Sequence, residues 1–145
     1  MKLNFPEYAF KVEQHGESLK IFDSIRKKWV VLTPEEWVRQ HAIAYLVQTK
    51  KYAASLIAVE RSLEFNGLKK RFDVLVYNKL AQPYLLVECK APEVSLSEDT
   101  LIQICTYNTQ FKVPYLWVSN GIHHIVFGLT QHGRYEVCQE FPELV

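Results

Sequence analysis

The stretch from Arg71 to Pro92, RFDVLVYNKLAQPYLLVECKAP, places ionisable residues inside two strongly apolar runs. Both runs are rich in the β-branched, aromatic and aliphatic residues that favour strands. Turn-forming residues at positions 78–83 separate the runs, so the stretch predicts a β-hairpin. Because burying an unpaired charge costs several kcal/mol, the charged residues of this hairpin constrain the fold more than any other part of the chain.

The pairing of the two strands predicts where these charges lie. A loop centred on Leu80 and Ala81 sets Asp73 directly opposite Glu88. Directly opposed side chains have Cβ atoms about 5 Å apart, and Lys90, two residues after Glu88, points to the same face. We therefore expect two carboxylates and one ammonium to converge on one face. The other face is expected to consist of Phe72, Val74, Val76, Leu85, Val87 and Cys89.

Two carboxylates held this close in a poorly solvated place repel each other and need a cation between them. Mg²⁺ prefers hard oxygen ligands, typically one or two carboxylates with water and substrate phosphate. We therefore predict a site for Mg²⁺, with Mn²⁺ as a substitute, at Asp73, Glu88 and the backbone carbonyl of Cys89. The alternative is a buried charge cluster that only links the strands. That cluster leaves one negative charge uncompensated unless Lys70 or Arg71 folds back or one acid protonates.

The pattern of Asp73 followed by Glu88-Cys89-Lys90 resembles the signature of the PD-(D/E)XK nuclease superfamily, an Asp on one strand and Glu-x-Lys on the next. The surrounding sequence is similar to the nuclease domain at the N-terminus of type I restriction-enzyme R subunits. The similar segments are TPEEWVRQ, LIAVERSL, KKRFDVLVY, LLVECKAP, the Gln103 to Tyr107 spacing and VSNG. The resemblance runs from about Leu19 to Gly128 and implies a restriction-endonuclease-like α/β fold, a mixed central β-sheet flanked by helices.

The segment Thr33-Pro34-Glu35-Glu36 predicts the start of a helix that runs to about Thr49. Thr33 is the N-cap, Pro34 occupies the first helical position, and Glu36 completes a capping box. In the resembled superfamily a Glu on the first helix often completes the metal site. The resemblance gives this role to Glu36, with Glu35 as the alternate. Glu36 as a capping residue favoured by the helix dipole is the competing interpretation.

Three cations, Lys69, Lys70 and Arg71, lead into the strand just ahead of Asp73. Cations beside a carboxylate-metal site attract and position a phosphate backbone, whereas the alternative is a solvated turn. We predict contact with nucleic acid. The resemblance also implies that Gln103 approaches the active site and the phosphate, although its residue type alone favours a surface position.

The rest of the chain predicts further strands and one more helix. Residues 1–16 lack clear periodicity and are expected to form an extended N-terminal arm. Basic residues 26–28 lie in a predicted hairpin turn, which favours a solvated turn over a phosphate contact. The remaining elements are expected as strands at Leu19–Phe22, Lys28–Leu32, Ser55–Phe65, Tyr115–Ser119, His123–Leu129 and Tyr135–Gln139, and as a helix with a capping box at Ser95–Glu98 that runs to about Phe111.

Composition sets the class of protein. With 145 residues and 48% hydrophobic content, residues 1–145 are expected to form a single domain. The net charge of +1 gives no sign of a global attraction to polyphosphate. The three cysteines, in apolar contexts, favour free buried thiols and a reducing cytoplasm. No signal peptide or apolar run of about 20 residues suggests a membrane segment.

The chemistry expected of these residues is metal-dependent hydrolysis of phosphodiester bonds by an endonuclease acting on DNA, in restriction, defence or repair. Asp73 and Glu88 would hold the metal, and Lys90 would hold the attacking water or the scissile phosphate. The alternative is a catalytically silent, nuclease-fold subunit that binds nucleic acid and works with a separate motor or specificity protein. The chain has no Walker-type loop, so we expect it not to translocate DNA by itself. Paired nicks need two sites, which favours a homodimer.

Overall fold

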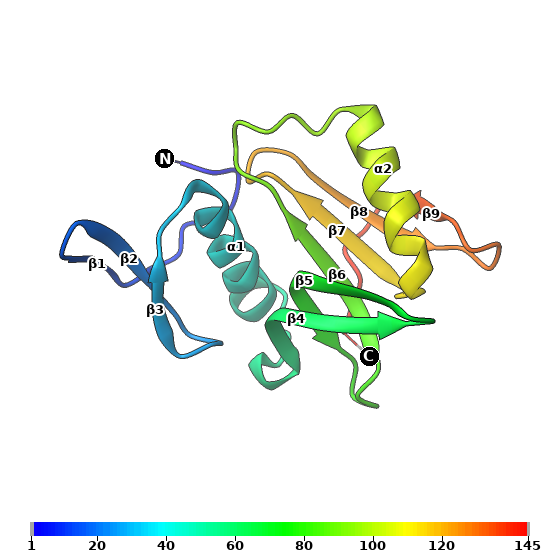
Figure 1. Ribbon diagram of the computed structural model, residues 1–145, viewed down its shortest axis with the longest axis horizontal. Coiled ribbons are helices and arrows are strands. Elements are labelled where there is room, and N and C mark those ends of the chain that lie inside the picture. The colour runs from blue at the N-terminus through cyan, green and yellow to red at the C-terminus, as the bar shows by residue number, and fades with distance from the viewer. Residues whose placement is uncertain (1, 145) are drawn as a thin grey trace.

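The computed structural model describes residues 2–144, which form nine strands and two α-helices (Figure 1). The strands are β1 (Val12–His15), β2 (Ser18–Asp23), β3 (Lys28–Val31), β4 (Ile57–Phe65), β5 (Leu68–Tyr77), β6 (Pro83–Cys89), β7 (Tyr115–Ser119), β8 (His124–Leu129) and β9 (Tyr135–Val137). The helices are α1 (Pro34–Ala44), which a π-helical turn continues through Tyr45–Thr49, and α2 (Glu98–Asn108), which a 3₁₀ turn continues through Thr109–Phe111. Another 3₁₀ turn, Ala54–Leu56, precedes β4. The two ends of the predicted domain, Met1 and Val145, lie outside the described residues.

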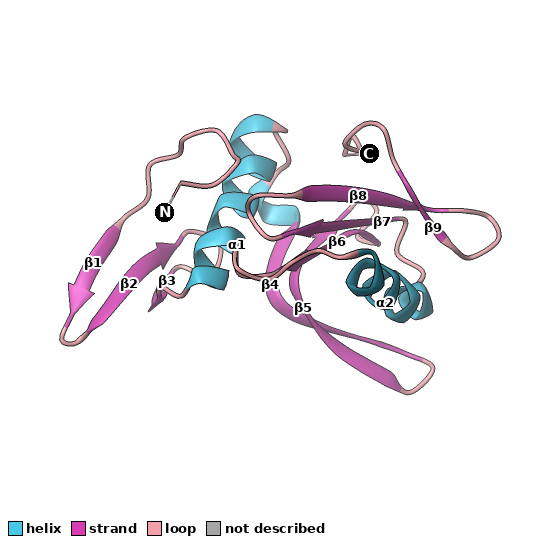
Figure 2. Ribbon diagram, turned by 90° about the horizontal axis from the view of Figure 1, so that it is seen from above, coloured by secondary structure: helices cyan, strands magenta, loops and turns pink. Residues whose placement is uncertain are grey.

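A six-stranded mixed sheet forms the centre of the fold. Its strand order is β4-β5-β6-β7-β8-β9, and β6 and β7 are parallel, whereas the other neighbouring pairs are antiparallel. Parallel neighbours need a crossover connection, which α2 provides. Helix α1 covers one face of the sheet and α2 covers the other (Figure 2). The predicted α/β class, with a mixed sheet flanked by helices, is confirmed.

A second, three-stranded antiparallel sheet of β1, β2 and β3 lies beside α1, at the left of Figure 1. The β2–β3 hairpin matches the predicted strands and buries Ile21 and Asp23 completely. The expected N-terminal arm is wrong in two respects. Residues 12–15 form β1, whose strand shows no buried position and so no alternation by which it could be recognised. Leu3 is buried, and Phe5 packs against the core on the α1 side.

The start of α1 has the predicted N-cap, Thr33, and Pro34 in its first turn, whereas the Glu36 carboxylate contacts Arg26, Arg39 and Gln40. The hydroxyl of Thr33 accepts a hydrogen bond from the backbone N–H of Glu36 at 3.0 Å. From there Val38, Ala42 and Leu46 recur at helical spacing and are fully buried. These residues form the face of α1 that packs against the sheet.

The start of α2 differs from the prediction. Ser97, not Ser95, is the N-cap, and its hydroxyl accepts a hydrogen bond from the backbone N–H of Thr100 at 3.2 Å. Leu96 packs against the core on the α2 side, so the chain enters the helix one residue after this contact. The predicted capping box at Ser95 was therefore two residues early.

Two apolar cores occupy the two faces of the six-stranded sheet. The α1-side core contains Leu3, Val38, Ala42, Ile43, Leu46, Tyr52, Ile57, Val74, Val76, Tyr84, Leu85, Val87, Cys89 and Trp117. The α2-side core contains Phe72, Leu75, Leu86, Phe111, Val113, Leu116, Val118 and Phe127. No helix among residues 2–144 is long and apolar enough to cross a membrane. All three cysteines are free, and burial raises the pKa of the Cys89 thiol well above its ordinary value.

From Val74 to Val76 the β5–β6 hairpin has the predicted register, with Val74 opposite Val87 and Val76 opposite Leu85; the register shifts by one residue at Tyr77, which lies opposite Pro83. The predicted position of Phe72 is wrong, because Phe72 belongs to the α2-side core. Alternation along β5 is interrupted between Phe72 and Val74, where the facing strand carries Glu60 with a φ of +58°. A non-glycine residue with positive φ is uncommon in a strand and marks a local irregularity. Asp73 therefore sits at a break in the sheet.

The two serines ahead of α2 offer a direct test of its N-cap. Ser97→Ala should lower the free energy of unfolding by about 1 kcal/mol, because it removes the acceptor for the Thr100 N–H. Ser95→Ala is the matched control and should change stability by less than about 0.5 kcal/mol. Urea unfolding followed by circular dichroism measures both values. Equal losses in the two variants would contradict the assignment of Ser97 as the cap.

Candidate active site

Strands β5 and β6 separate at the position of Asp73 and Glu88. They pair from Val74 to Tyr77, and the preceding part of β5 pairs with β4 alone (Figure 2). We call this point of separation the fork. There, the Asp73 carboxylate (Oδ2) accepts a hydrogen bond from the backbone N–H of Cys89 at 2.8 Å. This bond fixes Asp73 against β6 next to Glu88, close to the predicted pairing.

The side chains of the two acids face different cations. Asp73 Oδ1 lies 3.1 Å from Nη2 of Arg39, a residue of α1 whose side chain is 6% exposed. Glu88 instead forms an ion pair with Lys70 of β5. Lys70 Nζ also lies 3.3 Å from Oδ1 of Asn108 and 4.8 Å from the ring centroid of Tyr107, both on α2. Asp73 thus faces α1, whereas Glu88 faces α2.

The expected convergence of both carboxylates on one face is therefore not found in this arrangement. Glu88 keeps the regular alternation of β6 and lies on the same face as Leu86, whereas the irregularity opposite Glu60 turns Asp73 toward α1. Among residues 2–144, no group of three or more His, Cys, Asp or Glu side chains is placed to hold a metal ion. The predicted ligand set of Asp73, Glu88 and the Cys89 carbonyl stays a prediction.

Lys90 leaves the end of β6 half-buried, and its backbone N–H donates to the carbonyl of Ser119 at 2.9 Å. Its charge acts on Glu35 of α1. Burial, and next the negative charge of Asp73, raise the pKa of Glu35, while the positive charges of Arg39 and Lys90 partly offset the increase. Glu35, Asp73 and Lys90 therefore form one electrostatic group at the α1 side of the fork.

Arg39 is the centre of this group. Its guanidinium contacts four carboxylates: Glu36 at 2.6 Å from Nη1, and Glu35 at 3.1 Å, Asp73 at 3.1 Å and Glu60 at 3.5 Å from Nη2. Burial alone would lower the pKa of Arg39, but the charges of Glu36 and Asp73 outweigh this effect and raise it. We call Arg39 and these four acids the Arg39 cluster.

The two acids of the first turn of α1 have different surroundings. The Glu36 carboxylate is 7% exposed and accepts hydrogen bonds from Arg39, from Arg26 at 3.0 and 3.1 Å and from Gln40 at 3.0 Å. Glu35 is 47% exposed and contacts Arg39. Glu36 was the first choice for the helix acid of the metal site, and Glu35 was the alternate. The geometry favours Glu35, because it remains accessible near Asp73. A metal-binding role for either residue stays a prediction.

The Arg39 cluster continues into the three-stranded sheet. Arg26 Nε lies 2.6 Å from Oδ2 of the fully buried Asp23. Burial would raise the pKa of Asp23, but hydrogen bonds from the backbone and side chain of Arg26 lower it. Arg26 was expected in a solvated turn, and its side chain is only 16% exposed. The turn thus anchors the small sheet to α1, while Lys27 and Lys28 are exposed.

The residues predicted to contact nucleic acid differ in their exposure. Lys69 and Gln103 lie on the surface, and Arg71 is 66% exposed, with its Nε 2.7 Å from Glu60. Lys70 is paired with Glu88, which matches the alternative in which Lys70 folds back onto the acids. Asn108, fully buried, was not foreseen as its neighbour.

The sequence does not predict the contact between Arg39 and Asp73 either. Arg39 follows Glu35 and Glu36 by four and three residues, a helical spacing that indicates ion pairs along α1. The spacing carries no information about Asp73, which lies 34 residues further along the chain. Only the packing of α1 on the sheet brings the two together.

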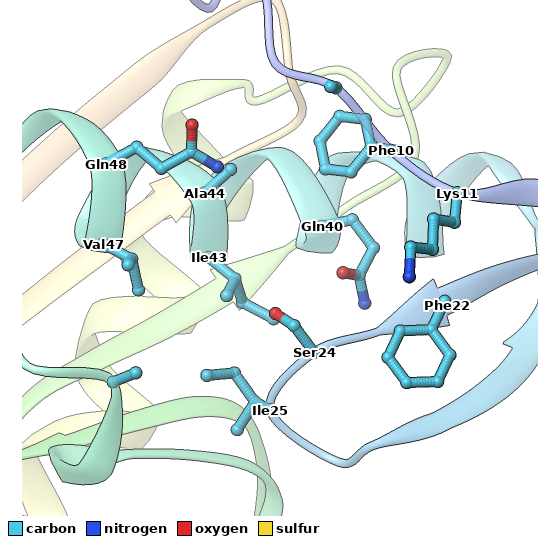
Figure 3. A pocket seen from close by; sticks show the side chains of 12 residues that line it. Phe10, Lys11, Phe22, Ser24, Ile25, Gln40, Ile43, Ala44, Val47 and Gln48 are labelled. Atoms are coloured by element: carbon cyan, nitrogen blue, oxygen red, sulfur yellow. The ribbon is translucent and has the colours of Figure 1, made fainter.

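A cavity of about 380 Å³ lies beside α1 and the three-stranded sheet (Figure 3). Phe10, Lys11 and Phe22 contribute to its wall, and Gln40 points into it from α1. Asp73 and Glu88 do not line it. Gln40 Nε2 donates to both Asp23 and Glu36 at 3.0 Å, so this cavity borders the Arg39 cluster without being part of the fork.

Fold and site together define an α/β domain with an Asp and a Glu-x-Lys sequence at the fork of a mixed sheet. Residues 34–142 match the family model described as the type I restriction enzyme R protein N terminus. The chain therefore belongs to the family of type I restriction enzyme R protein N-terminal domains. Comparison with curated proteins found no match. The family model includes α1, the hairpin of the fork and α2.

Glu35 and Glu36 should respond differently to amide substitution. Glu36→Gln should lower stability by about 3 kcal/mol, because it weakens buried contacts with two arginines. Glu35→Gln should leave stability at pH 7 unchanged or raise it by less than about 1 kcal/mol, since water screens this half-exposed group. Thermal unfolding of both variants measures the contrast.

The pH dependence gives the sign of the Glu35 effect. Because the folded protein raises the pKa of Glu35, folding disfavours its charged form. Any gain in the free energy of unfolding of Glu35→Gln should therefore appear at neutral pH, where this carboxyl is charged in the unfolded chain. The gain should vanish as pH falls below about 4, where the carboxyl is protonated in the unfolded chain as well. A loss in Glu35→Gln as large as that in Glu36→Gln would show that both acids are structural.

Proposed function

We propose that this domain is a metal-dependent endonuclease that hydrolyses phosphodiester bonds in DNA, as part of a restriction or defence system. Membership of the restriction enzyme R protein family supports a nuclease role. The observation that carries the proposal is the position of Asp73 and of the Glu88-Cys89-Lys90 sequence at the fork of β5 and β6. The Cys89 N–H holds Asp73 there, beside the end of β6.

The chemistry of the donor set fits Mg²⁺ or Mn²⁺. Asp73 and Glu88 offer hard carboxylate oxygens, and the Cys89 carbonyl and the Glu35 carboxylate are the further oxygens that we assign to the ion. Both fork acids already sit against a positive charge, on Arg39 or Lys70, so each position favours a cation. Such an ion supplies Lewis acidity and lowers the pKa of its bound water.

The protein's own residues would bind and orient the substrate. Lys90 is half-buried at the fork, and a positive charge there would hold the scissile phosphate and stabilise the negative charge that develops on its oxygens. Exposed Lys69 and Arg71 on the β4–β5 hairpin would position the flanking backbone through phosphate contacts. Gln103 on the exposed side of α2 is assigned a secondary contact.

A second candidate function is a nucleic-acid-binding accessory domain without cleavage. The observation that favours it is that Asp73 and Glu88 are paired with different protein cations on different faces of the sheet. In that case the partner would be a motor or specificity subunit that supplies the activity. A homodimer, which would bring two forks to the two strands of a duplex, belongs to the nuclease proposal.

Cleavage assays on plasmid, linear duplex, single-stranded DNA and RNA, with Mg²⁺ or Mn²⁺ and with chelator, test the proposal. Asp73→Asn, Glu88→Gln and Lys90→Ala should each lower metal-dependent cutting of DNA by about 100-fold or more, because each removes charge stabilisation at the reacting phosphate. Exposed Glu64→Gln and Lys79→Ala are the matched controls and should cut like the unchanged protein.

Circular dichroism establishes that each variant is folded. Cutting that persists in all three fork variants would remove the active-site assignment. An unchanged protein that binds DNA and cuts none of the four substrates would instead favour the accessory function.

A further inference from the structure

The Arg39 cluster holds more negative than positive charge at its centre. Nη2 of Arg39 alone lies within 3.5 Å of three carboxylates, and these come from α1, β4 and β5. Arg26 reaches Glu36 and Arg71 reaches Glu60 from the periphery, at 3.0 and 2.7 Å. Among the described residues, Arg39 is the cation that contacts Asp73.

The hydrogen bonds of Arg39 are incomplete. Its Nε–H is buried and has no hydrogen-bond partner among residues 2–144. Leaving a buried donor unsatisfied carries a free-energy cost, so the guanidinium is held here by its carboxylates although one of its donors is unpaired. Its position therefore depends on the four negative charges around it.

The Asp73 carboxylate has one oxygen that a competing cation can take over. Oδ2 is occupied by the Cys89 N–H, which holds the residue against β6. Oδ1 faces the guanidinium at 3.1 Å. Any cation that binds Asp73 from the α1 side must therefore compete with Arg39 for Oδ1.

We infer that Arg39 is a positioning residue that occupies the place of a cation at Oδ1 of Asp73, and that a metal ion reaches Asp73 by displacing its guanidinium. This inference rests on the proposed metal-dependent function for its biological meaning, although it concerns metal affinity alone. Arg39 holds the acids in place against their mutual repulsion and, for the same reason, lowers their affinity for a metal.

Removing the guanidinium should make metal binding tighter. Arg39→Met should bind Mn²⁺ about tenfold more tightly or better than the unchanged protein, measured by titration calorimetry without nucleic acid, because a buried positive charge no longer opposes the ion. Its melting temperature should be lowered in chelator and should recover in MnCl₂ by more than that of the unchanged protein. Arg71→Met, which loses a contact with Glu60 but none with Asp73, should bind Mn²⁺ within about twofold of the unchanged protein.

Two further variants keep the test decisive. Asp73→Asn added to Arg39→Met should abolish the gain in Mn²⁺ affinity, which ties the gain to this carboxylate. If Arg39→Met is unfolded in chelator, folding on addition of MnCl₂ supports the inference. In that case Arg39→Lys, a smaller cation that cannot span the four acids, should bind Mn²⁺ more tightly than the unchanged protein.

The inference is overturned if folded Arg39→Met binds Mn²⁺ no more tightly than the unchanged protein, or if Arg39→Met fails to fold in MnCl₂ while Arg39→Lys shows unchanged affinity. Its failure is separate from failure of the proposed function. Tight Mn²⁺ binding by Arg39→Met, together with no cutting by the unchanged protein, would keep the inference and reject the nuclease. Cutting by the unchanged protein, together with unchanged Mn²⁺ affinity in Arg39→Met, would keep the nuclease and reject the inference.

Discussion

Pairing each buried carboxylate with a cation is the constraint on which this structure depends. Asp73 and Glu88 lie where two strands separate, and neither is fully exposed to water. A buried acid without a counter-charge costs several kcal/mol, a large part of the stability of a domain of this size. The counter-charges come from Arg39 and Lys70 on opposite faces of the sheet. Both faces must therefore be assembled before both acids are stabilised.

Features that depend on neighbours in sequence were predicted correctly. The register of β5 and β6 from Val74 to Val76 follows from the two apolar runs, although it shifts by one residue beside the loop. The Thr33 cap follows from a spacing of three residues within one turn. The mixed sheet with helices on both faces follows from the order of the elements along the chain.

Features that depend on distant packing were not predictable in the same way. The interruption of alternation at Asp73 arises from the conformation of Glu60 on the adjacent strand, and no turn residue marks that position in the sequence. The contact between Arg39 and Asp73 requires the final orientation of α1 on the sheet. Strand β1 has no buried position, so hydrophobic patterning could not reveal it. Long-range geometry, not residue type, decides each of these cases.

The anchoring of the small sheet has a consequence for the acid at the fork. Asp23, Arg26, Glu36 and Arg39 form an unbroken series of ion pairs that ends at Asp73. Because these groups have little exposure to solvent, water cannot readily replace a contact that is pulled apart. The small sheet is therefore linked to the acid at the fork through the first turn of α1, and we expect a substitution in the outer hairpin that breaks one of these pairs to change the surroundings of Asp73 as well.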